Sequence, residues 1–460
     1  MTSHPHGVVR RDDASLGPVD LLAMRTETTL ERETIRRVTM RIIPLLFALY
    51  VVGFLDRVNI AIASLRMNQD IGLSAAAYGL GSGIFFLGYA LFEVPSNILL
   101  ARVGARWWIA RIAVTWGILA CAMALVTGPK SFFVLRLLLG FAEAGFFPGV
   151  IYYLTEWYPE KRRARATSAF TIGIPVSSLV GGPLGALLLG LDGRLGLAGW
   201  QWLFLVEGIP SVLLGLAVLF WLPDRPATAT WLSSDQRSWL ASQIARDASS
   251  RANSHETVWS AMSNRTLWWL CAPYTVYILC GYAIVLWSPL VMRSLLEVSD
   301  QQVGLITGVT GLVGVAAMLG SAAVSDRRNE RIVQSAMALG FLAVSLFAVA
   351  AAPHPIIGVV GLATAMWSCN AFLPVFWCLP SRFLGGVGAA AGIALINSVG
   401  NIGGFLGPSV VGALKTATGG FSGAFAGLAA LAFVGSLAML TLRRSVVLAS
   451  PRMTPAQSSS

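Results

Sequence analysis

Long apolar runs separated by short polar pieces dominate the pattern of hydrophobic positions along this chain. A membrane-spanning helix needs about 20 consecutive, predominantly apolar residues, and twelve segments reach that length. The runs are continuous rather than alternating in polarity, so they predict helices and not the strands of a barrel. The predicted spans cover residues 42–64, 76–100, 107–127, 131–154, 166–190, 201–222, 267–290, 301–324, 332–352, 355–379, 387–414 and 419–441.

The longest polar stretch between spans divides the chain into two groups of six. We therefore predict an all-α integral membrane protein with two six-helix halves. The expected parts are a cytoplasmic N-terminal segment (1–41), a first half (42–222), a central cytoplasmic loop (223–266), a second half (267–441) and a cytoplasmic tail (442–460).

The two halves also repeat each other. Two features recur at one offset of 225 positions, a Gly-Pro pair and an arginine in a basic loop: Gly182–Pro183 with Gly407–Pro408, and Arg102 with Arg327. A constant offset predicts parallel duplication of a six-span unit. Transporters built in this way hold the substrate near mid-membrane, between halves that rock against each other. Close helix packing is the alternative role for the glycines.

Composition and charge agree with a membrane location. The chain is 55% hydrophobic and 12% charged, against about 25% charged in an average soluble domain. With both termini inside, most of the 33 Lys and Arg residues become cytoplasmic, which is the positive-inside bias. The net charge of +11 is therefore expected to meet lipid phosphate and not nucleic acid. Only five of the Lys and Arg residues are expected on the outer side of the membrane: Arg66, Lys130, Arg194, Arg293 and Lys415.

No residue pattern indicates a metal site, a disulfide or a cofactor. All five cysteines lie in predicted spans without a C-x-x-C pair, so we interpret them as packing residues. The four histidines lie outside the spans. Residues 1–41 lack the apolar core and cleavage site of a signal peptide, so the N-terminus is expected to stay in the cytoplasm.

Few ionisable side chains interrupt the spans, where a charge costs about 2.5–3.5 kcal/mol or more and tends to face a cavity or a partner. Asp56 and Arg57 lie in the first span. Arg136 and Glu143 lie in the fourth, two helical turns apart on one face. Because Asp56 and Arg57 are adjacent, they point about 100° apart, and each needs a partner on another helix.

The economical arrangement pairs Asp56 with Arg136 and Arg57 with Glu143. A proton on Glu143 would then free Arg57 to bind a substrate carboxylate as a planar fork, so that proton and anion bind together. The sequence leaves open which of Asp56 and Glu143 takes up the proton. A purely structural set of ion pairs between two spans is the alternative.

Four further charged residues are assigned to gates or structural pairing. Glu93 lies near the cytoplasmic end of the second span and Glu207 near the start of the sixth, and these boundary positions favour pairing over substrate contact. Arg102 and Arg327 occupy equivalent basic loops. The cluster EKRRARA at 160–166 is predicted to be solvated and lipid-facing.

Five sequence motifs occur in the predicted spans and the residues that flank them: FLDRVNIA, GYALFEVPSN, RLLLGFAEAGFFPGVIYYLTEWYPEKRRARA, GLAGWQWLFLVEGIP and GIALINSVGNIGGFLGP. With them the chain resembles the major facilitator superfamily, and specifically its anion:cation symporter branch of the tartrate and phthalate permease type, over nearly all of 42–441. The loop ARVGARWW departs from the usual G-x-L-a-D-R-x-G-R-K pattern because it lacks the Asp.

The resemblance implies the major facilitator fold and uptake of organic acids with protons. It implies proton-linked roles for Asp56 and Glu143, tuning by Arg136, and substrate contacts from Arg57, Tyr89 and Asn397. From the residues alone, Tyr89 could equally be an interface aromatic and Asn397 an interhelical hydrogen-bonding group.

The aromatic content bears on the substrate. Sugar-acid members of the branch often carry Tyr two residues before the Asp, where this chain has Phe54, so a less polar or aromatic acid is favoured. Trp377 is included among the expected substrate contacts. Core or lipid-facing positions are the alternative for most aromatics of the tenth span, Trp367, Phe372, Phe376 and Trp377.

We therefore predict a proton-coupled symporter of a small organic carboxylate such as tartrate or phthalate. It would work by alternating access as a monomer in the inner membrane, with a proton gradient as driving force and no cofactor. A proton-driven drug or metabolite exporter is the alternative, since Gly182–Pro183 could be an antiporter motif. A receptor is less favoured because no segment is large enough for an output domain, and no catalytic motif indicates an enzyme.

Overall fold

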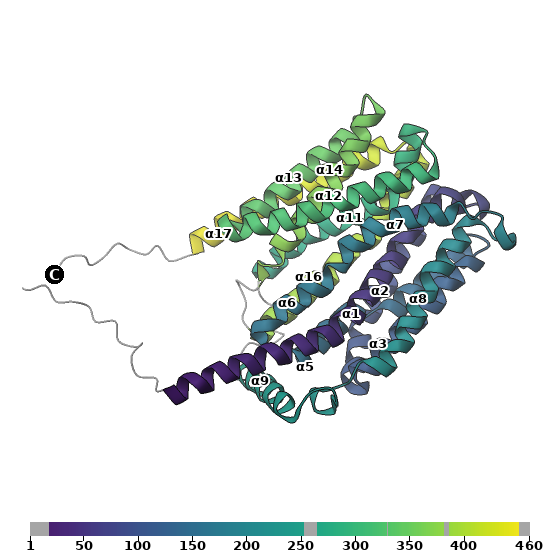
Figure 1. Ribbon diagram of the computed structural model, residues 1–460. Helices are drawn as coiled ribbons and strands as arrows, with labels where there is room; N and C mark the ends of the chain where they lie inside the picture. Colours follow the sequence, from purple (N-terminus) through teal and green to yellow (C-terminus); the bar gives the residue numbers. More distant parts are fainter. Residues whose placement is uncertain (1–17, 253–264, 329, 381–385, 450–460) are drawn as a thin grey trace, which may run out of the picture.

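The computed structural model describes residues 18–252, 265–328, 330–380 and 386–449, and every long element in these ranges is a helix (Figure 1). The N-half comprises α1 (Pro18–Asp70), α2 (Ala75–Val103), α3 (Ala105–Ala122), α4 (Pro129–Glu143), α5 (Phe146–Trp157), α6 (Glu160–Thr171), α7 (Gly173–Leu189) and α8 (Gly199–Trp221). The C-half comprises α11 (Arg265–Leu296), α12 (Asp300–Arg328), α13 (Arg331–Ala350), α14 (Pro355–Phe376), α16 (Gly386–Thr418) and α17 (Ser422–Ala449).

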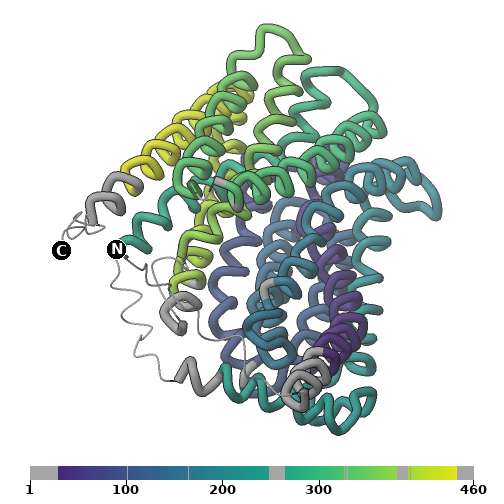
Figure 2. The backbone as a smooth tube through the Cα atoms, turned by 60° about the vertical axis from the view of Figure 1, so that its left-hand side comes forward, coloured from purple at the N-terminus to yellow at the C-terminus, as the bar shows by residue number. Residues whose placement is uncertain are grey.

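The two halves lie side by side as two bundles, seen from two directions in Figures 1 and 2. The start of α1 and the end of α17 lie at the same end of the molecule, at the left of Figure 1. We call this end the termini side, and the opposite end the far side. The helices α1, α7 and α12 run between these two ends. A residue's place along them therefore shows how far it lies from the termini side and from the far side, which we call its depth.

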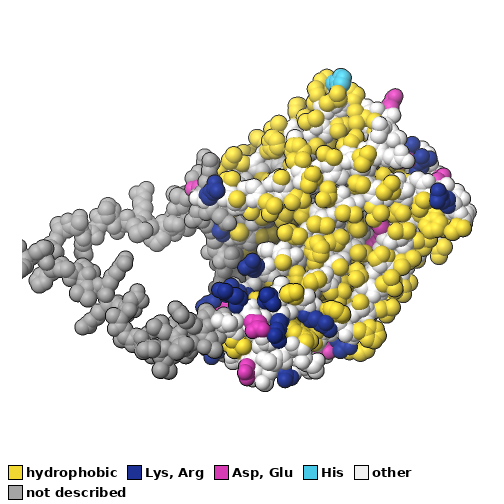
Figure 3. All heavy atoms as spheres, viewed as in Figure 1, with side chains coloured by type: hydrophobic (Ala, Val, Ile, Leu, Met, Phe, Trp, Pro, Cys, Tyr) yellow, Lys and Arg dark blue, Asp and Glu magenta, His cyan; other side chains and the backbone are white. Residues whose placement is uncertain are grey.

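The prediction of an all-α membrane protein is confirmed. Eleven helical segments among the described residues are long and apolar enough to cross a membrane, and each coincides with a predicted span. The remaining predicted span, 387–414, is occupied by α16. Figure 3 shows a broad hydrophobic belt on one face, with charged side chains gathered toward its two edges.

Two predicted spans consist of two helices each. In the span predicted at 131–154, α4 ends at Glu143 and α5 begins at Phe146, because Gly145 adopts a left-handed conformation with φ 85°. A Cβ on Gly145 would lie 2.3 Å from Ser96 Oγ, so the break also needs a glycine for space. Glu143 is thus the last residue of its helix, which makes the break part of its setting.

The polar connection between the halves contains structure that the sequence analysis missed. A short 3₁₀ turn, Pro226–Thr228, is followed by α9 (Ser234–Ala252), which packs on α1 and α5. Leu240 of α9 is fully buried, and Gln236 accepts a hydrogen bond from Arg37 at 3.4 Å. The remaining parts of the predicted segments, 1–17, 253–264 and 450–460, lie outside the described residues.

The internal repeat is visible in the helices themselves. Shifting the bounds of α2 by 225 positions gives the bounds of α12. The halves meet mainly where α2 packs on α16 and α7 packs on α12, with a smaller contact between α1 and α11. A Cβ on Gly79 would lie 2.4 Å from Pro408 O, and a Cβ on Gly304 would lie 2.5 Å from Gly182 O. Gly79 and Gly304 are equivalent under the offset, so the two contacts are copies of one packing arrangement.

Charged groups close the far side between the halves. Arg66 Nε donates to Asp300 Oδ2 at 2.5 Å, and Arg293 Nη1 lies 3.3 Å from Asp300 Oδ1. Arg293 also donates to the Leu65 carbonyl at 2.6 Å. Further hydrogen bonds between the N-half and the C-half lie on the far side or at mid-depth.

Candidate functional site

Arg57 stands between the two halves at mid-depth. Its Nη2 pairs with Glu143 Oε1 of α4, and its Nη1 donates to the Tyr282 hydroxyl of α11 at 3.3 Å. The predicted Arg57–Glu143 pair is therefore confirmed as a contact. The Glu143 side chain is 6% exposed and that of Arg57 18%. The guanidinium is thus the more accessible member of a buried ion pair, and it touches both halves at once.

Aromatic rings surround this guanidinium on the N-half. Its central carbon lies 5.2 Å from the Tyr89 ring centroid, 5.5 Å from that of Phe85 and 5.9 Å from that of Phe54. Rings within about 6 Å of a guanidinium stabilise its charge through their negative faces. Tyr89 is 6% exposed, so the structure places its ring against Arg57.

The predicted pair of Asp56 with Arg136 is wrong. Asp56 Oδ2 instead accepts hydrogen bonds from Trp116 Nε1 of α3 at 2.7 Å and from Ser211 Oγ of α8 at 2.8 Å. Arg136 donates to the carbonyls of Gly81 and Ser82 on α2, at 3.4 and 3.2 Å. Neutral donors and backbone carbonyls thus contact the two charged groups that were predicted to pair with each other. Arg136 also lies 4.8 Å from the Phe85 ring centroid, beside the rings that hold Arg57.

A second contact between the halves lies closer to the termini side. Asn397 Nδ2 of α16 donates to Glu93 Oε1 of α2 at 3.2 Å, and the Tyr274 hydroxyl donates to Asn397 Oδ1 at 3.4 Å. Glu93 Oε2 is buried and has no partner. The polar contact predicted for Asn397 therefore exists as an interhelical bond, and Glu93 is paired across the interface as its structural interpretation required.

The C-half offers a surface of stacked aromatic rings beside Asn397. Tyr274 stacks on Phe376 with 5.1 Å between centroids, and Tyr277 stacks on Phe372 at 4.8 Å. Trp377 meets Tyr274 edge-on at 4.9 Å. Phe372 and Phe376 are almost fully buried, so these two belong to the core, whereas Trp377 is half-buried.

The residues predicted for gates fall in different settings. Arg102 and Arg327 are exposed near the termini-side ends of α2 and α12, and neither forms an ion pair within the described ranges. Glu207 is 3% exposed in the third turn of α8. It also makes no ion pair with a described residue, so the structural pairing expected for it is not seen.

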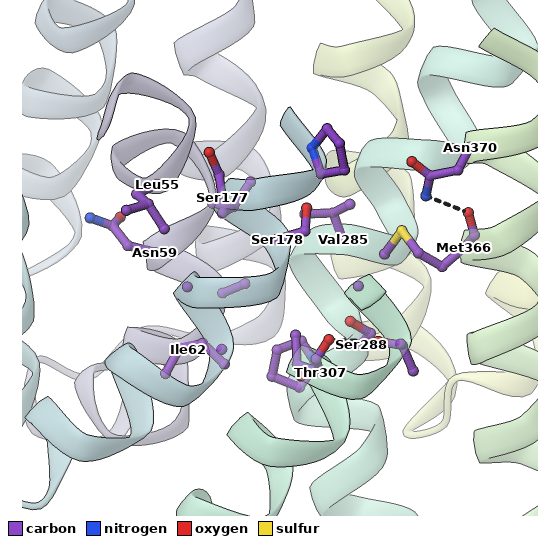
Figure 4. A pocket seen from close by; sticks show the side chains of 18 of the residues that line it. Leu55, Asn59, Ile62, Ser177, Ser178, Val285, Ser288, Thr307, Met366 and Asn370 are labelled. Atoms are coloured by element: carbon purple, nitrogen blue, oxygen red, sulfur yellow. Dashed lines mark hydrogen bonds between the residues drawn. The ribbon is translucent and has the colours of Figure 1, made fainter. Parts of the chain in front are cut away.

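Glu207 lines a cavity between the halves, which we call the interhalf cavity. Its walls come from α1, α7 and α8 on one side and from α11, α12 and α14 on the other. Its volume open to the centre of a water molecule is about 60 Å³. One water needs about 10–15 Å³ by this measure, so the cavity holds about four to six waters. Figure 4 shows the hydroxyl and amide side chains around it, Ser177, Ser178, Ser288, Thr307 and Asn370.

Sequence reasoning missed the neutral hydrogen-bond partners of Arg57 and Asp56, which are Tyr282, Trp116 and Ser211. One of them carried a detectable signal, because Tyr282 is 225 positions after Arg57 and is its equivalent in the repeat. The described residues contain no cluster of three His, Cys, Asp or Glu side chains that could hold a metal ion.

The comparisons agree with this architecture. A family model described as Major Facilitator Superfamily matches residues 45–408. The chain belongs to the major facilitator superfamily. Its members are transporters, so this chain is a multi-pass membrane transporter and not an enzyme.

Relatives of known name cover nearly the whole chain. A protein of Agrobacterium vitis named "Putative tartrate transporter" is 42% identical over 428 residues, covering 93% of this chain and 99% of that protein. A "Quinolone resistance transporter" of Acinetobacter baumannii is 43% identical over 85% of this chain and 90% of its own. The "Inner membrane transport protein RhmT" of Escherichia coli is 36% identical over 90% and 96%.

Solved structures match in fold. A bacterial homolog of the human lysosomal transporter Spinster, in an inward-facing and occupied conformation, superposes with a TM-score of 0.74 at 17% identity, covering 90% of this chain and 98% of its own. The xylose transporter XylE from E. coli, in a partially occluded inward-open conformation, gives 0.70 at 14% identity, covering 88% and 98%. At these identities the likeness establishes the fold alone.

Proposed function

We propose that this transporter is a proton-coupled symporter of a small organic carboxylate. The observation that supports this most is the position of Arg57, a partly accessible guanidinium between the halves whose charge is matched by one buried carboxylate, Glu143. A planar guanidinium can bind a carboxylate with two parallel hydrogen bonds. The substrate anion and the Glu143 carboxylate would therefore compete for one cation.

That competition supplies the coupling. When Glu143 is ionised, Arg57 is engaged and the site is neutral; adding a substrate anion would leave a net negative charge in a buried place, which is costly. When Glu143 takes up a proton, Arg57 keeps its charge and loses its partner. The anion then restores neutrality. A proton and a carboxylate thus enter together, with Arg57 changing partner between them.

The hydrogen bond to Tyr282 links this exchange to the movement of the halves. Arg57 belongs to α1 and Tyr282 to α11, so any rotation of Arg57 toward a substrate changes a contact across the interface. Rocking of the halves around a central site is how transporters with repeated halves expose their substrate to each side in turn. Binding at Arg57 would therefore shift the balance between the two arrangements.

The surroundings favour a flat or weakly polar acid over one rich in hydroxyls. Phe54, Phe85 and Tyr89 flank Arg57. The buried Tyr274 contacts Asn397, and the half-buried Trp377 packs against Tyr274. Aromatic faces contact flat apolar groups well, while amide and hydroxyl groups orient the polar end of a ligand. The relative named as a tartrate transporter supports an organic acid as the substrate class.

The orientation follows from charge. We place the termini side in the cytoplasm because the basic residues gather there, including the α6 segment EKRRARA. The membrane would be the bacterial inner membrane, in agreement with the printed name of the relative RhmT. With the far side closed by Arg66, Arg293 and Asp300, the arrangement described here is then closed to the outside.

Export of a drug or metabolite is the second candidate. The relative named as a quinolone resistance transporter supports it, and the fold serves either direction. The positive charge of Arg57 favours a carboxylate substrate for uptake and for export alike. The direction of proton-driven flux therefore decides between the two candidates.

Uptake into proteoliposomes tests the proposal. Purified protein is offered tartrate, phthalate, a hydroxyphenylacetate and a sugar acid, with and without an inward proton gradient. We expect one acid to accumulate and the accumulation to vanish when the gradient is collapsed. Folded protein that accumulates none of them, or that drives one outward against its gradient, would overturn the symport proposal.

Glu143→Gln tests the coupling step. The amide mimics the protonated acid, so we expect gradient-driven accumulation to be lost while exchange of internal for external substrate continues. Glu297→Gln is the matched control, since this glutamate is exposed on the far side and makes no ion pair with a described residue. Accumulation retained in Glu143→Gln would exclude Glu143 as the coupling acid.

A further inference from the structure

The interhalf cavity lies beside Asp56 and extends from there toward the far side. Along α1, Asp56 is followed by Asn59 and Ile62, which line the cavity, and then by Arg66 of the far-side ion pairs. The cavity thus extends from the depth of Arg57 toward the closed far side. Contacts between α7 and α12 help to close it, since a Cβ on Gly182 would lie 2.6 Å from Gly304 O.

Two polar side chains in its wall are buried without partners. Glu207 is 3% exposed, and its Oε2 has no hydrogen-bond partner. Asn59 is 5% exposed, and neither its amide nitrogen nor its amide oxygen has one. Most buried polar groups are hydrogen-bonded. Polar atoms without partners, next to a cavity large enough for several waters, can bind water or a proton delivered by water.

No positive charge balances Glu207. The titratable groups that face this turn of α8 from the helices packed against it are Asp56 on α1 and Cys121 on α3. The cavity walls from α7, α11, α12 and α14 contribute only neutral groups. Ser211, one turn further along α8, donates to Asp56 at 2.8 Å. Glu207 and Asp56 therefore lie at neighbouring turns, and neither has a Lys or Arg within 4 Å among the described residues.

We infer that Glu207 binds a second transported proton, taken from water on the far side; this rests on the proposed proton symport. When the halves separate on the far side, the cavity opens because its two walls belong to different halves. A hydronium ion can then give its proton to a Glu207 oxygen and leave as water. Closing the halves buries the carboxyl group, and burial of a lone charged carboxylate is strongly unfavourable.

Protonation of Glu207 is thus a condition for closing the far side. The Arg57–Glu143 pair cannot supply this condition, because it stays neutral in the closed arrangement whether or not a substrate is present. Two proton sites then have separate tasks. Glu143 links one proton to the anion at Arg57, and Glu207 links another to the change between the two arrangements.

The proton-to-substrate ratio tests the inference. In proteoliposomes, the substrate gradient that just stops net flux is measured at several imposed pH gradients, and the slope gives the number of protons per substrate. We expect Glu207→Gln to carry one proton fewer per substrate than the unmodified protein. We also expect its uptake rate to lose the increase that the unmodified protein should show when the pH on the far side is lowered. Glu297→Gln, the exposed control, should keep both properties.

Each result has a distinct meaning. An unchanged ratio and pH profile in Glu207→Gln would overturn the inference while leaving the symport proposal intact; absence of proton-driven uptake in the unmodified protein would overturn both. Stimulation by a sodium gradient that Glu207→Gln abolishes would identify the ligand as sodium and overturn the proton assignment. Thermal unfolding separates these results from misfolding, since an amide in place of a buried, protonated acid should leave the melting temperature unchanged or raised.

Discussion

Replacing Gly304 by Ala tests how closely the halves must approach on the far side. A Cβ at this position would lie 2.4 Å from the Ala186 Cβ and 2.5 Å from Gly182 O, across the contact between α12 and α7. Ordinary contacts between nonbonded carbon atoms are about 3.5–4.0 Å. The two helices must therefore move apart by roughly 1 Å to accept one methyl group. The same methyl group meets no obstacle once the halves have separated there.

The size of the effect follows from this difference. Overpacking by an extra methyl group typically costs about 1–3 kcal/mol, and here the cost falls on the arrangement with a closed far side alone. A difference of this size changes the ratio of two arrangements by about 5–150-fold. We therefore expect Gly304→Ala to populate an arrangement open on the far side.

Distances between spin labels measure the shift. Labels on cysteines placed at the exposed positions Gln69 and Gln301, after removal of the five native cysteines, report the separation of α1 and α12 on the far side. Gly304→Ala should add a population at longer distance. Gly320→Ala is the matched control on the same helix, because a Cβ there meets no atom within 4 Å. Identical distance distributions in the two variants would refute the reasoning.

Three further outcomes follow from the same contacts. Asp300→Asn removes the partner of Arg66 and Arg293; because Arg66 is half exposed, we expect a shift of about 1 kcal/mol toward far-side opening, measured with the same labels and reduced in 1 M salt. Arg57→Lys should weaken substrate binding at least tenfold in a direct binding assay, since an ammonium group cannot form the fork; near-normal affinity would remove Arg57 from the site. Trp116→Phe leaves Asp56 with one donor and should lower the melting temperature, whereas an unchanged value would show that water replaces the indole.

The spans could be predicted because lipid leaves the backbone few choices. A continuous apolar run of sufficient length must form a helix, and the observed helices coincide with the predicted runs. The break at Gly145 was not predicted, because the apolar run continues through it and the left-handed turn depends on the close approach of Ser96 from α2. Hydrophobicity gives the length of a span and does not give its kinks.

Of the charged site, the pair of Arg57 with Glu143 was predicted, whereas the partners of Asp56 and Arg136 were not. Arg57 and Glu143 form the predicted ion pair because opposite charges in an apolar setting have few other partners. Asp56 and Arg136 did have others, an indole, a hydroxyl and two backbone carbonyls, and those groups are too common in the sequence to be singled out. Burial of Glu207 was missed because its distance from the end of the span was underestimated.

The hydrogen bond between Arg57 and Tyr282 joins a residue to its own counterpart in the repeat. Such a contact can occur only next to the axis that relates the two halves. In a symmetric dimer of six-helix proteins the same position would bring two arginines together, and their repulsion would oppose assembly. Fusing the two copies into one chain allows each to carry a different residue. A single positive charge can then sit at the centre of the molecule, which a dimer of identical subunits could not provide.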